Sequence, residues 1–199
     1  MNLTKDQEMV CGINAVNEII SIRPNSVTTL FIEDDKGKRI QELDQLAKQN
    51  NIEVVLQDSS FFQKNFSEMN HQSVAIVCYK RLEENENYLE SLFEKDNLLL
   101  LILEHITDPH NVGACIRTAA AAGVDAVIVP KNRSCHLTPT VRKISSGGAE
   151  LIPFVVVTNI VRTINKLKSA GVMIYGTDMK ASKLHNEITY GDKSALIIG

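Results

Sequence analysis

The stretch that decides the fold is LLLLIL (residues 98–103), followed after four residues by DPHNVGACIRTAAAAG (residues 108–123). An unbroken apolar run of this length is typical of a strand that is buried on both faces of a parallel sheet. The Asp-Pro pair then predicts a turn. The small residues of the following segment predict a slim helix that can pack closely on the sheet or on another backbone. Together these features favour a strand–turn–helix unit of an α/β domain.

Two polar residues of this helix, Asn111 and Arg117, are the first candidates for chemistry. Asn111 suits the N-cap, where its side chain can accept from the exposed amides of the first turn. Arg117 follows six residues later, nearly two turns on, so we expect the two side chains to face roughly the same side. A lone arginine near the carboxyl end of a parallel strand can clamp a phosphate. The alternative is a capped helix whose arginine stem simply lies along the surface.

The remainder of the second half alternates between strands and helices, which predicts a parallel sheet covered on both faces. We expect its helices at residues 110–122, 138–146 and 159–170, and its strands at residues 98–104, 125–130, 153–157, 172–176 and 194–199. The first half predicts a smaller α/β domain, with helices at residues 9–22, 38–50 and 59–69, and strands at residues 28–33, 52–57 and 73–79.

An acidic, apolar-poor segment separates the two halves at residues 81–97 and reads as a partly helical linker. We therefore predict a small N-terminal α/β domain at residues 1–80, the linker, and a parallel-sheet domain at residues 98–199. The charge differs between the halves: residues 1–97 carry 10 basic and 17 acidic side chains, whereas residues 98–199 carry 11 and 7. A polyanion would then meet the second half, unless the difference is ordinary surface scatter.

Several classes of protein and site lose support from composition. The chain has 199 residues, of which 44% are hydrophobic, and no apolar run is long enough for a membrane helix. The polar N-terminus shows no signal peptide. The dinucleotide fingerprint GxGxxG and the Walker A sequence are absent. Four scattered cysteines predict buried, reduced thiols in a cytoplasmic protein. His105, His110 and His136 lack the spacing of metal ligands, so we expect no metal.

Further polar candidates lie in the second half, where the phosphates of a polyanion would be met by lysine and arginine side chains. The candidate phosphate-binding residues are Lys131, Arg133, Arg142 and Lys143. A solvated surface explains each of these equally well. Residues 145–148 form a small-residue stretch that either caps a helix or permits close backbone approach to the polyanion or to a partner subunit. Glu150 either pairs with an arginine or is exposed.

The segment DPHNVGACIRTAAAAGVDAVIVP closely resembles the first motif of the SpoU (TrmH) branch of the SPOUT RNA 2′-O-methyltransferases. The resemblance continues through LTPTVRKISSGGAELIPFVVVTN and IYGTDM. VCGINAVNEII and the N-terminal domain resemble the substrate-binding domain of the RlmB type, whose members methylate a guanosine ribose in 23S ribosomal RNA. The resemblance spans essentially the whole chain, and it implies an S-adenosylmethionine-dependent enzyme that methylates a ribose 2′-hydroxyl. Transfer RNA ribose methyltransferases share the first motif and remain an alternative.

By this resemblance, Arg117 corresponds to the arginine at the ribose and Asn111 to the asparagine that supports that site. The residues that would line S-adenosylmethionine are Gly176, Thr177, Leu196, Ile198 and Gly199. Arginine rarely releases a proton, so we interpret Arg117 as an electrostatic clamp on the substrate phosphate and hydroxyl. The family fold implies a trefoil knot and a site completed across a homodimer.

The sequence departs from the family at its end. A glycine–glutamate–glycine motif should begin near Gly199, and a serine- and asparagine-containing motif should follow. We therefore expect that the sequence is cut short, that the 199-residue chain lacks the knot, and that it is inactive and binds the cofactor weakly or not at all. Two other hypotheses stay open: a non-catalytic remnant that binds RNA or a partner, and an unrelated small-molecule α/β enzyme.

Overall fold

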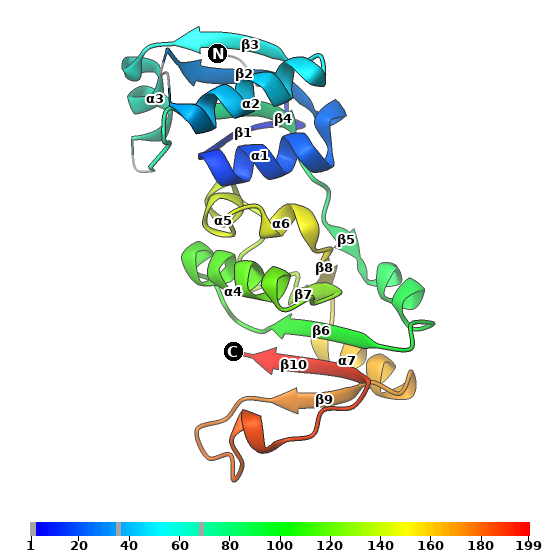
Figure 1. The fold of residues 1–199 in the computed structure, drawn as a ribbon. Helices are drawn as coiled ribbons and strands as arrows, with labels where there is room; N and C mark the ends of the chain where they lie inside the picture. The colour runs from blue at the N-terminus through cyan, green and yellow to red at the C-terminus, as the bar shows by residue number, and fades with distance from the viewer. Residues whose placement is uncertain (1–2, 35–36, 68–69) are drawn as a thin grey trace.

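A computed structural model describes residues 3–34, 37–67 and 70–199 of the chain. Within these residues the elements form two sheets, one of four strands and one of six. The four-stranded sheet and its helices lie at one end of the molecule, and the six-stranded sheet lies at the other (Figure 1). Helices α5 (Pro139–Ile144) and α6 (Gly148–Leu151) lie between the two sheets.

The N-terminal unit is built on a mixed sheet of strand order β1-β4-β2-β3. Strand β4 pairs antiparallel with both β1 and β2, whereas β2 and β3 are parallel. Its strands are β1 (Gln7–Cys11), β2 (Val27–Glu33), β3 (Glu53–Gln57) and β4 (Val74–Tyr79). Its helices are α1 (Ile13–Ile22), the 3-10 turn η1 (Pro24–Ser26), α2 (Lys38–Gln49) and α3 (Ser59–Phe66). Helices α1 and α2 share a buried apolar cluster with one sheet face, and α3 shares a separate cluster with other sheet residues.

The C-terminal unit is built on a parallel sheet of strand order β5-β8-β7-β6-β10-β9. Its strands are β5 (Glu84–Asn85), β6 (Leu98–Leu103), β7 (Ala126–Pro130), β8 (Phe154–Val157), β9 (Met173–Gly176) and β10 (Lys193–Ile198). Besides α5 and α6, its helical segments are η2 (Glu86–Leu92), α4 (Pro109–Ala121), α7 (Ile160–Ser169) and η3 (His185–Glu187). The α/β class and the parallel sheet predicted from the apolar runs are confirmed.

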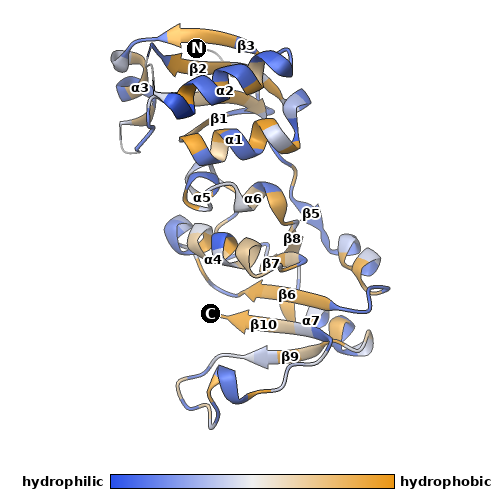
Figure 2. Ribbon diagram, viewed as in Figure 1, coloured by the Kyte–Doolittle hydropathy of each residue, from blue (hydrophilic) through white to orange (hydrophobic). Residues whose placement is uncertain are grey.

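The run LLLLIL folds as β6 because its residues can be buried on both faces of the sheet. Leu100 and Ile102 belong to one apolar cluster, with η2 and α7, whereas Leu101 and Leu103 belong to the other, with α4, α5 and α6. This alternation follows from the two-residue period of a strand. The central strands are accordingly the most apolar parts of the ribbon, and the edge strand β9 is paler (Figure 2).

Three elements differ from the prediction. Residues 9–11 belong to strand β1 and not to the first helix, because Val10 packs in the apolar cluster on one face of the sheet while Met9 and Cys11 pack in the cluster on the other. The segment 81–97 contributes β5 and η2 to the second unit, with Leu89 and Leu92 buried. The helix expected at residues 138–146 ends at Ile144 and is followed by the separate turn of α6. Residues 68–69 of the helix expected at 59–69 lie outside the described residues.

Helix α4 packs tightly on α5 because position 113 has no side chain. A Cβ atom at Gly113 would lie 2.6 Å from Ile144 Cβ and 3.1 Å from the Val141 carbonyl oxygen. The stripe of small residues noted in the sequence is therefore used for close helix packing.

We expect Gly113→Val to lower the free energy of unfolding by about 1–3 kcal/mol, because the added side chain forces the two helices apart. Urea unfolding monitored by circular dichroism measures this loss. Gly123→Ala is a poor control, because Gly123 has a positive φ of 73°. Gly176→Ala is a better one, because a Cβ there meets nothing within 4 Å. Equal stability of Gly113→Val and the parent chain would show that this packing is loose.

Candidate active site

The candidate site residues gather at the carboxyl edge of the parallel sheet. Strands β6, β7, β9 and β10 run in the same direction, so the residues that follow them emerge at one edge. The backbone confirms the convergence: Glu104 N donates to Ile198 O at 2.9 Å, and Thr177 N donates to Ile197 O at 3.2 Å. In open α/β sheets this edge is where ligands bind.

Helix α4 begins at this edge, and its N-cap is Asp108. The Asp108 side chain accepts from His110 N at 3.0 Å, and Pro109 occupies the first helical position. The prediction that Asn111 caps the helix is therefore wrong. Asp-Pro supplies both a capping carboxylate and a preset φ angle, so the N-cap lies three residues before Asn111. Asn111 lies in the first turn, with an exposed side chain.

Arg117 lies midway along α4, and its side chain is exposed. Within residues 3–34, 37–67 and 70–199, its guanidinium has no hydrogen-bond or ion-pair partner. A six-residue separation in an α-helix corresponds to a difference of about 120° around the axis. The expectation that Asn111 and Arg117 face the same side is therefore wrong for a regular helix. The free guanidinium nevertheless keeps all of its donors available to an anion.

Helix α6 packs against the backbone of α4 at Arg117. A Cβ atom on Gly148 would lie 3.3 Å from Arg117 Cα and 3.2 Å from the Ile116 carbonyl oxygen. Gly147 has a positive φ of 94° and turns the chain between α5 and α6. The small-residue stretch at 145–148 therefore makes its close backbone approach to helix α4 of the same chain.

The predicted cofactor residues lie at the ends of β9 and β10. Gly199 lies against the turn after β6, where a Cβ atom would be 2.5 Å from the Glu104 carbonyl oxygen. The Thr177 hydroxyl donates to Ile197 O at 3.3 Å, which ties the end of β9 to β10. Gly176 has no heavy atom within 4 Å of a built Cβ, so its surface is open.

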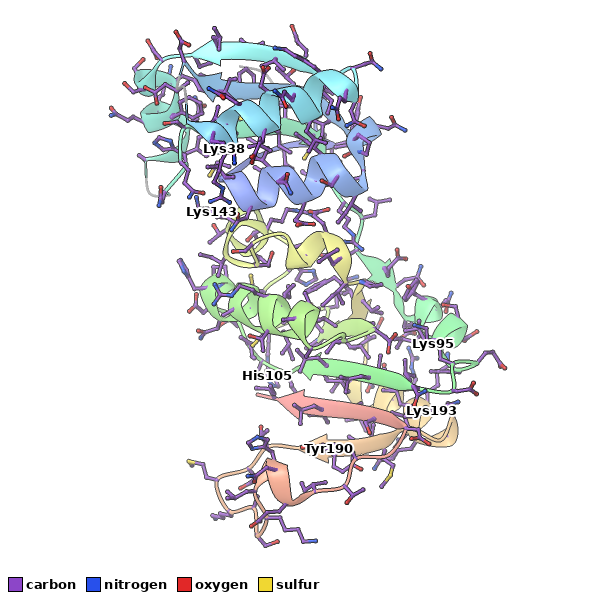
Figure 3. All side chains as sticks on the ribbon, viewed as in Figure 1. Lys38, Lys95, His105, Lys143, Tyr190 and Lys193 are labelled. Carbon is purple, nitrogen blue, oxygen red and sulfur yellow. The ribbon has the colours of Figure 1, made fainter. Side chains whose placement is uncertain are left out.

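A cavity of about 490 Å³ lies beside these strand ends, and Gly176, Thr177 and Leu196 line it. Its volume is within the range of about 300–1,000 Å³ that is usual for small-molecule sites. Tyr175 and Tyr190 contribute aromatic walls, with their ring centroids 4.8 Å apart. Figure 3 shows Tyr190 beside β9, near the excursion that joins β9 to β10. Ile198 lines a different, apolar groove between the sheet and α4.

The loop after β7 carries Lys131 and Arg133, both exposed as a phosphate contact requires. Cys135 N donates to Ile106 O at 2.9 Å, so this loop lies against the turn that precedes α4. Arg133 has a positive φ of 58°. The structure therefore brings these two cations to the same edge of the sheet as the start of α4.

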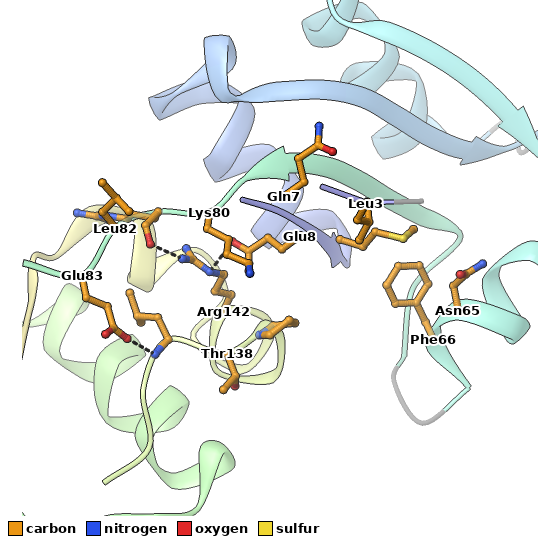
Figure 4. Close-up of a pocket in the computed structure, with 14 residues that line it drawn as sticks. Leu3, Gln7, Glu8, Asn65, Phe66, Lys80, Leu82, Glu83, Thr138 and Arg142 are labelled. Atoms are coloured by element: carbon orange, nitrogen blue, oxygen red, sulfur yellow. Dashed lines mark hydrogen bonds and ion pairs between the residues drawn. The ribbon is translucent and has the colours of Figure 1, made fainter. Parts of the chain in front are cut away.

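Glu83, before β5, anchors this basic loop. Its carboxylate accepts from Leu137 N at 2.9 Å and contacts His136 Nδ1 at 2.9 Å (Figure 4 shows the Glu83 carboxylate with one of these contacts dashed). His136 Nε2 lies 3.1 Å from Lys131 O. Both ring nitrogens face acceptors, which favours the doubly protonated imidazolium. Burial alone would lower the pKa of His136, but the contacts with Glu83 and with the Lys131 carbonyl raise it above its ordinary value.

A raised pKa in the folded state means that this contact stabilises most below pH 6.5 and loses its effect as the pH rises through the folded pKa. We therefore expect Glu83→Gln to destabilise the chain more at pH 6 than at pH 8.5, by less than about 1 kcal/mol, because the pair is partly solvated. Urea unfolding at the two pH values measures the difference. An effect of Glu83→Gln that grows with pH would contradict this assignment.

Arg142 differs from the prediction, whereas the role of Lys143 in RNA binding stays a prediction. Arg142 is buried, with its side chain 2% exposed, and it forms ion pairs with Glu8 and Glu150. The expectation that it binds RNA phosphate is therefore wrong, because its charge is satisfied inside the protein. Lys143 points toward the N-terminal unit, where its Nζ lies 3.7 Å from Cys11 Sγ (Figure 3). Glu150 pairs with Arg142, which confirms the first of the two alternatives given for it.

The four cysteines are free thiols, with Cys11 and Cys78 buried. Burial raises the pKa of Cys78 to about 11, so it stays protonated at neutral pH. In the part of the chain that the structure describes, no three histidine, cysteine, aspartate or glutamate side chains are grouped as a metal site. No helix among the same residues has the length and apolar character needed to cross a bilayer.

Sequence reasoning missed Glu83 and Glu8 as functional candidates. Glu83 is more than fifty positions from His136, and no local pattern indicates their contact. Glu8 lies in strand β1 and is buried. A buried carboxylate needs a charged or hydrogen-bonding partner, but its burial becomes evident only from the structure.

Comparison with known proteins defines the relationships of the chain. Residues 98–199 match the profile of the SpoU rRNA Methylase family, and residues 9–82 match that of RNA 2′-O ribose methyltransferase substrate binding. A protein of Coxiella burnetii named 23S rRNA (guanosine-2′-O-)-methyltransferase RlmB is 38% identical over 193 residues, which is 96% of this chain and 77% of the relative. The protein of that name from Pseudomonas aeruginosa is 40% identical, over 96% of this chain and 78% of its own.

A solved structure gives the same fold. The SpoU methyltransferase AviRb from Streptomyces viridochromogenes, crystallised in complex with the cofactor AdoMet, superposes with a TM-score of 0.75 at 19% identity. The match covers 98% of this chain and 73% of that chain.

Proposed function

This chain belongs to the SpoU rRNA methylase family, and from that premise we propose that it methylates the ribose 2′-hydroxyl of a guanosine in 23S ribosomal RNA, using S-adenosylmethionine. The observation that carries the proposal is the free, exposed guanidinium of Arg117 on the helix that starts at the carboxyl edge of the sheet. It lies on a family-matched domain, and a substrate-binding domain precedes it.

Arg117 binds the substrate and orients it. Its planar donors can engage a ribose hydroxyl and an adjacent phosphate at once. A positive charge beside the hydroxyl stabilises the negative charge that develops on the oxygen as its proton leaves. Because arginine holds its own proton, the hydroxyl proton leaves to the substrate phosphate or to another neighbour. Asn111 acts as a second polar group on the exposed first turn.

The residues at the strand ends suit S-adenosylmethionine. Gly176, Thr177 and Leu196 border the cavity of about 490 Å³, and Gly199 and Ile198 end the neighbouring strand. The open surface at Gly176 admits a ligand beside the backbone. When bound there, the cofactor supplies a methyl group on a sulfonium. The expectation that the 199-residue chain binds it weakly stays a prediction.

The charge distribution suggests how RNA is engaged. Lys131 and Arg133 are exposed and lie near α4, so they are the basic residues best placed for phosphate. The N-terminal unit supplies further contacts with the RNA. We also propose that the protein acts on ribosomal RNA in the cytoplasm and that it forms a homodimer, as the resemblance of its first motif implies.

The test is methyl transfer by the protein expressed from its natural gene, using S-adenosylmethionine with a deuterated methyl group. The substrates are 23S ribosomal RNA and transfer RNA from cells that lack the gene. We expect labelled 2′-O-methylguanosine in the 23S fraction, identified by nucleoside mass spectrometry. Label in transfer RNA alone would favour the transfer RNA alternative. RNA binding without any label would favour the non-catalytic alternative.

A further inference from the structure

A buried cluster of charged side chains joins the N-terminal unit to the C-terminal unit. The Glu150 carboxylate, on α6, accepts from an arginine of each unit: Oε2 lies 2.7 Å from Arg23 Nε, and Oε1 lies 2.6 Å from Arg142 Nη1. Arg142 Nε lies 3.0 Å from Glu8 Oε1, on strand β1. This last pair is close but is not aligned as a hydrogen bond, so it contributes charge attraction alone.

Burial distinguishes this cluster from the surface ion pairs of the chain. The side chains of Arg142 and Glu150 are each 2% exposed, whereas the Lys166–Glu90 pair is 43% and 59% exposed. Two backbone contacts extend the cluster across the junction: Arg81 Nη1 donates to Ala149 O at 2.6 Å, and Arg142 Nη2 donates to Arg81 O at 3.1 Å (Figure 4 shows Arg142 beside Glu8).

Helices α5 and α6, which carry Arg142 and Glu150, also touch the helix of the active site. Gly113 of α4 meets Ile144, and Gly148 meets the backbone of Arg117. On their other side, Gly147 lies against Glu18 of helix α1. The α5–α6 segment therefore lies between the N-terminal unit and α4 (Figure 1). A displacement of the N-terminal unit would be transmitted through this segment to α4.

Charged contacts fix an orientation more narrowly than apolar contacts do. A carboxylate held by two guanidinium groups has defined directions for both partners, whereas an apolar surface can slide. Removal of one partner leaves an uncompensated buried charge, so alternative orientations of the two units are disfavoured.

We propose that Arg142 and Glu150 are positioning residues, which hold the N-terminal unit in one orientation relative to Arg117 so that bound RNA reaches the active site. This proposal rests on the function proposed above, because it assigns RNA binding to the N-terminal unit. Neither residue contacts the substrate. Their effect passes through α5 and α6 to the backbone of α4.

The first test measures orientation without RNA or methylation. Nitroxide labels at Gln63→Cys on α3 and Lys168→Cys on α7, two exposed positions, report the distance between the units by double electron–electron resonance. Cys115→Ala and Cys135→Ser remove the half-buried natural thiols. We expect one narrow distance distribution in the parent chain and a clearly broadened one in Glu150→Gln. Glu90→Gln, the same change at an exposed pair in the same unit, should leave the distribution narrow.

The second test separates positioning from simple stability. If the competent orientation falls to about a tenth of the population, the apparent affinity for RNA falls about tenfold. In the protein expressed from its natural gene, we expect Glu150→Gln to raise KM for 23S ribosomal RNA about tenfold at unchanged kcat, because correctly oriented molecules keep their catalytic groups. Arg23→Gln, at the rim of the cluster, should give a smaller effect in the same direction. It also serves if Glu150→Gln does not fold.

An unchanged distance distribution in folded Glu150→Gln and Arg23→Gln would overturn the proposal. A broadened distribution with unchanged KM would overturn the positioning role as well. If the parent protein gives a narrow distance distribution but methylates no RNA, the proposed function is contradicted. The fixed orientation of the two units is then still supported.

Discussion

Arg117→Ala is expected to reduce ribose methylation by at least about 100-fold while RNA binding is largely retained. The guanidinium is exposed and free of partners among the described residues, so its removal costs the fold little. It removes the one positive charge that we place beside the ribose hydroxyl. The measurement is the occupancy of 2′-O-methylguanosine in 23S ribosomal RNA from cells that carry the substitution in the chromosomal gene.

Arg117→Lys and Arg133→Ala are the matched controls. Lysine keeps the charge but loses the planar pair of donors, so we expect Arg117→Lys to retain only part of the activity. Arg133→Ala removes an exposed arginine from the nearby loop and should weaken RNA binding with little change in kcat. Full methylation by Arg117→Ala would exclude the role assigned to this residue.

Arg142→Ala is expected to lower the free energy of unfolding by about 3–5 kcal/mol, because it leaves Glu8 and Glu150 buried without their shared cation. For a chain of this size, the melting temperature should fall by roughly 10 °C. Differential scanning calorimetry measures the change. Arg133→Ala, which removes an exposed arginine from the same unit, should change stability by less than about 0.5 kcal/mol.

The loss in Arg142→Ala should also depend on pH in a defined direction. Burial raises the pKa of Glu8, although Arg142 and Arg23 lower it in part. Removal of Arg142 raises this pKa further, and a carboxyl with a raised folded pKa loses stability as the pH rises through that value. The variant should therefore be closer to the parent at pH 5 than at pH 8. A loss that is greatest at pH 5 would show that Glu8 does not carry it.

The sequence predicted the parallel sheet because an unbroken apolar run such as LLLLIL removes all its side chains from water only when both faces of the strand are covered. It also predicted most helices, since their apolar periodicity is strong. It failed at β1, where the apolar residues 9–11 are compatible with either a strand or the start of the first helix. It failed again at α6, because a single turn has no periodicity to detect.

The candidate site was predictable where it depends on strand order and much less so where it depends on contacts. The family resemblance implied that Gly176, Thr177 and Gly199 line one site, and the parallel strands of the predicted sheet are compatible with this because their carboxyl ends lie at one edge. The ion pairs of Arg142 join residues from β1, α5 and α6. No spacing along the chain indicates these contacts, and an arginine in an amphipathic segment reads as solvated. Its burial follows from the packing of two units.

The most direct test of the central claim is a map of every 2′-O-methylated nucleotide in 23S ribosomal RNA and in transfer RNA, from cells with and without the gene. The account predicts that one guanosine of 23S ribosomal RNA loses its ribose methyl group on deletion, while transfer RNA is unchanged. Restoration of the gene should return the mark, and the Arg117→Ala allele should not. An unchanged 23S map, or loss of a mark from transfer RNA alone, would contradict it.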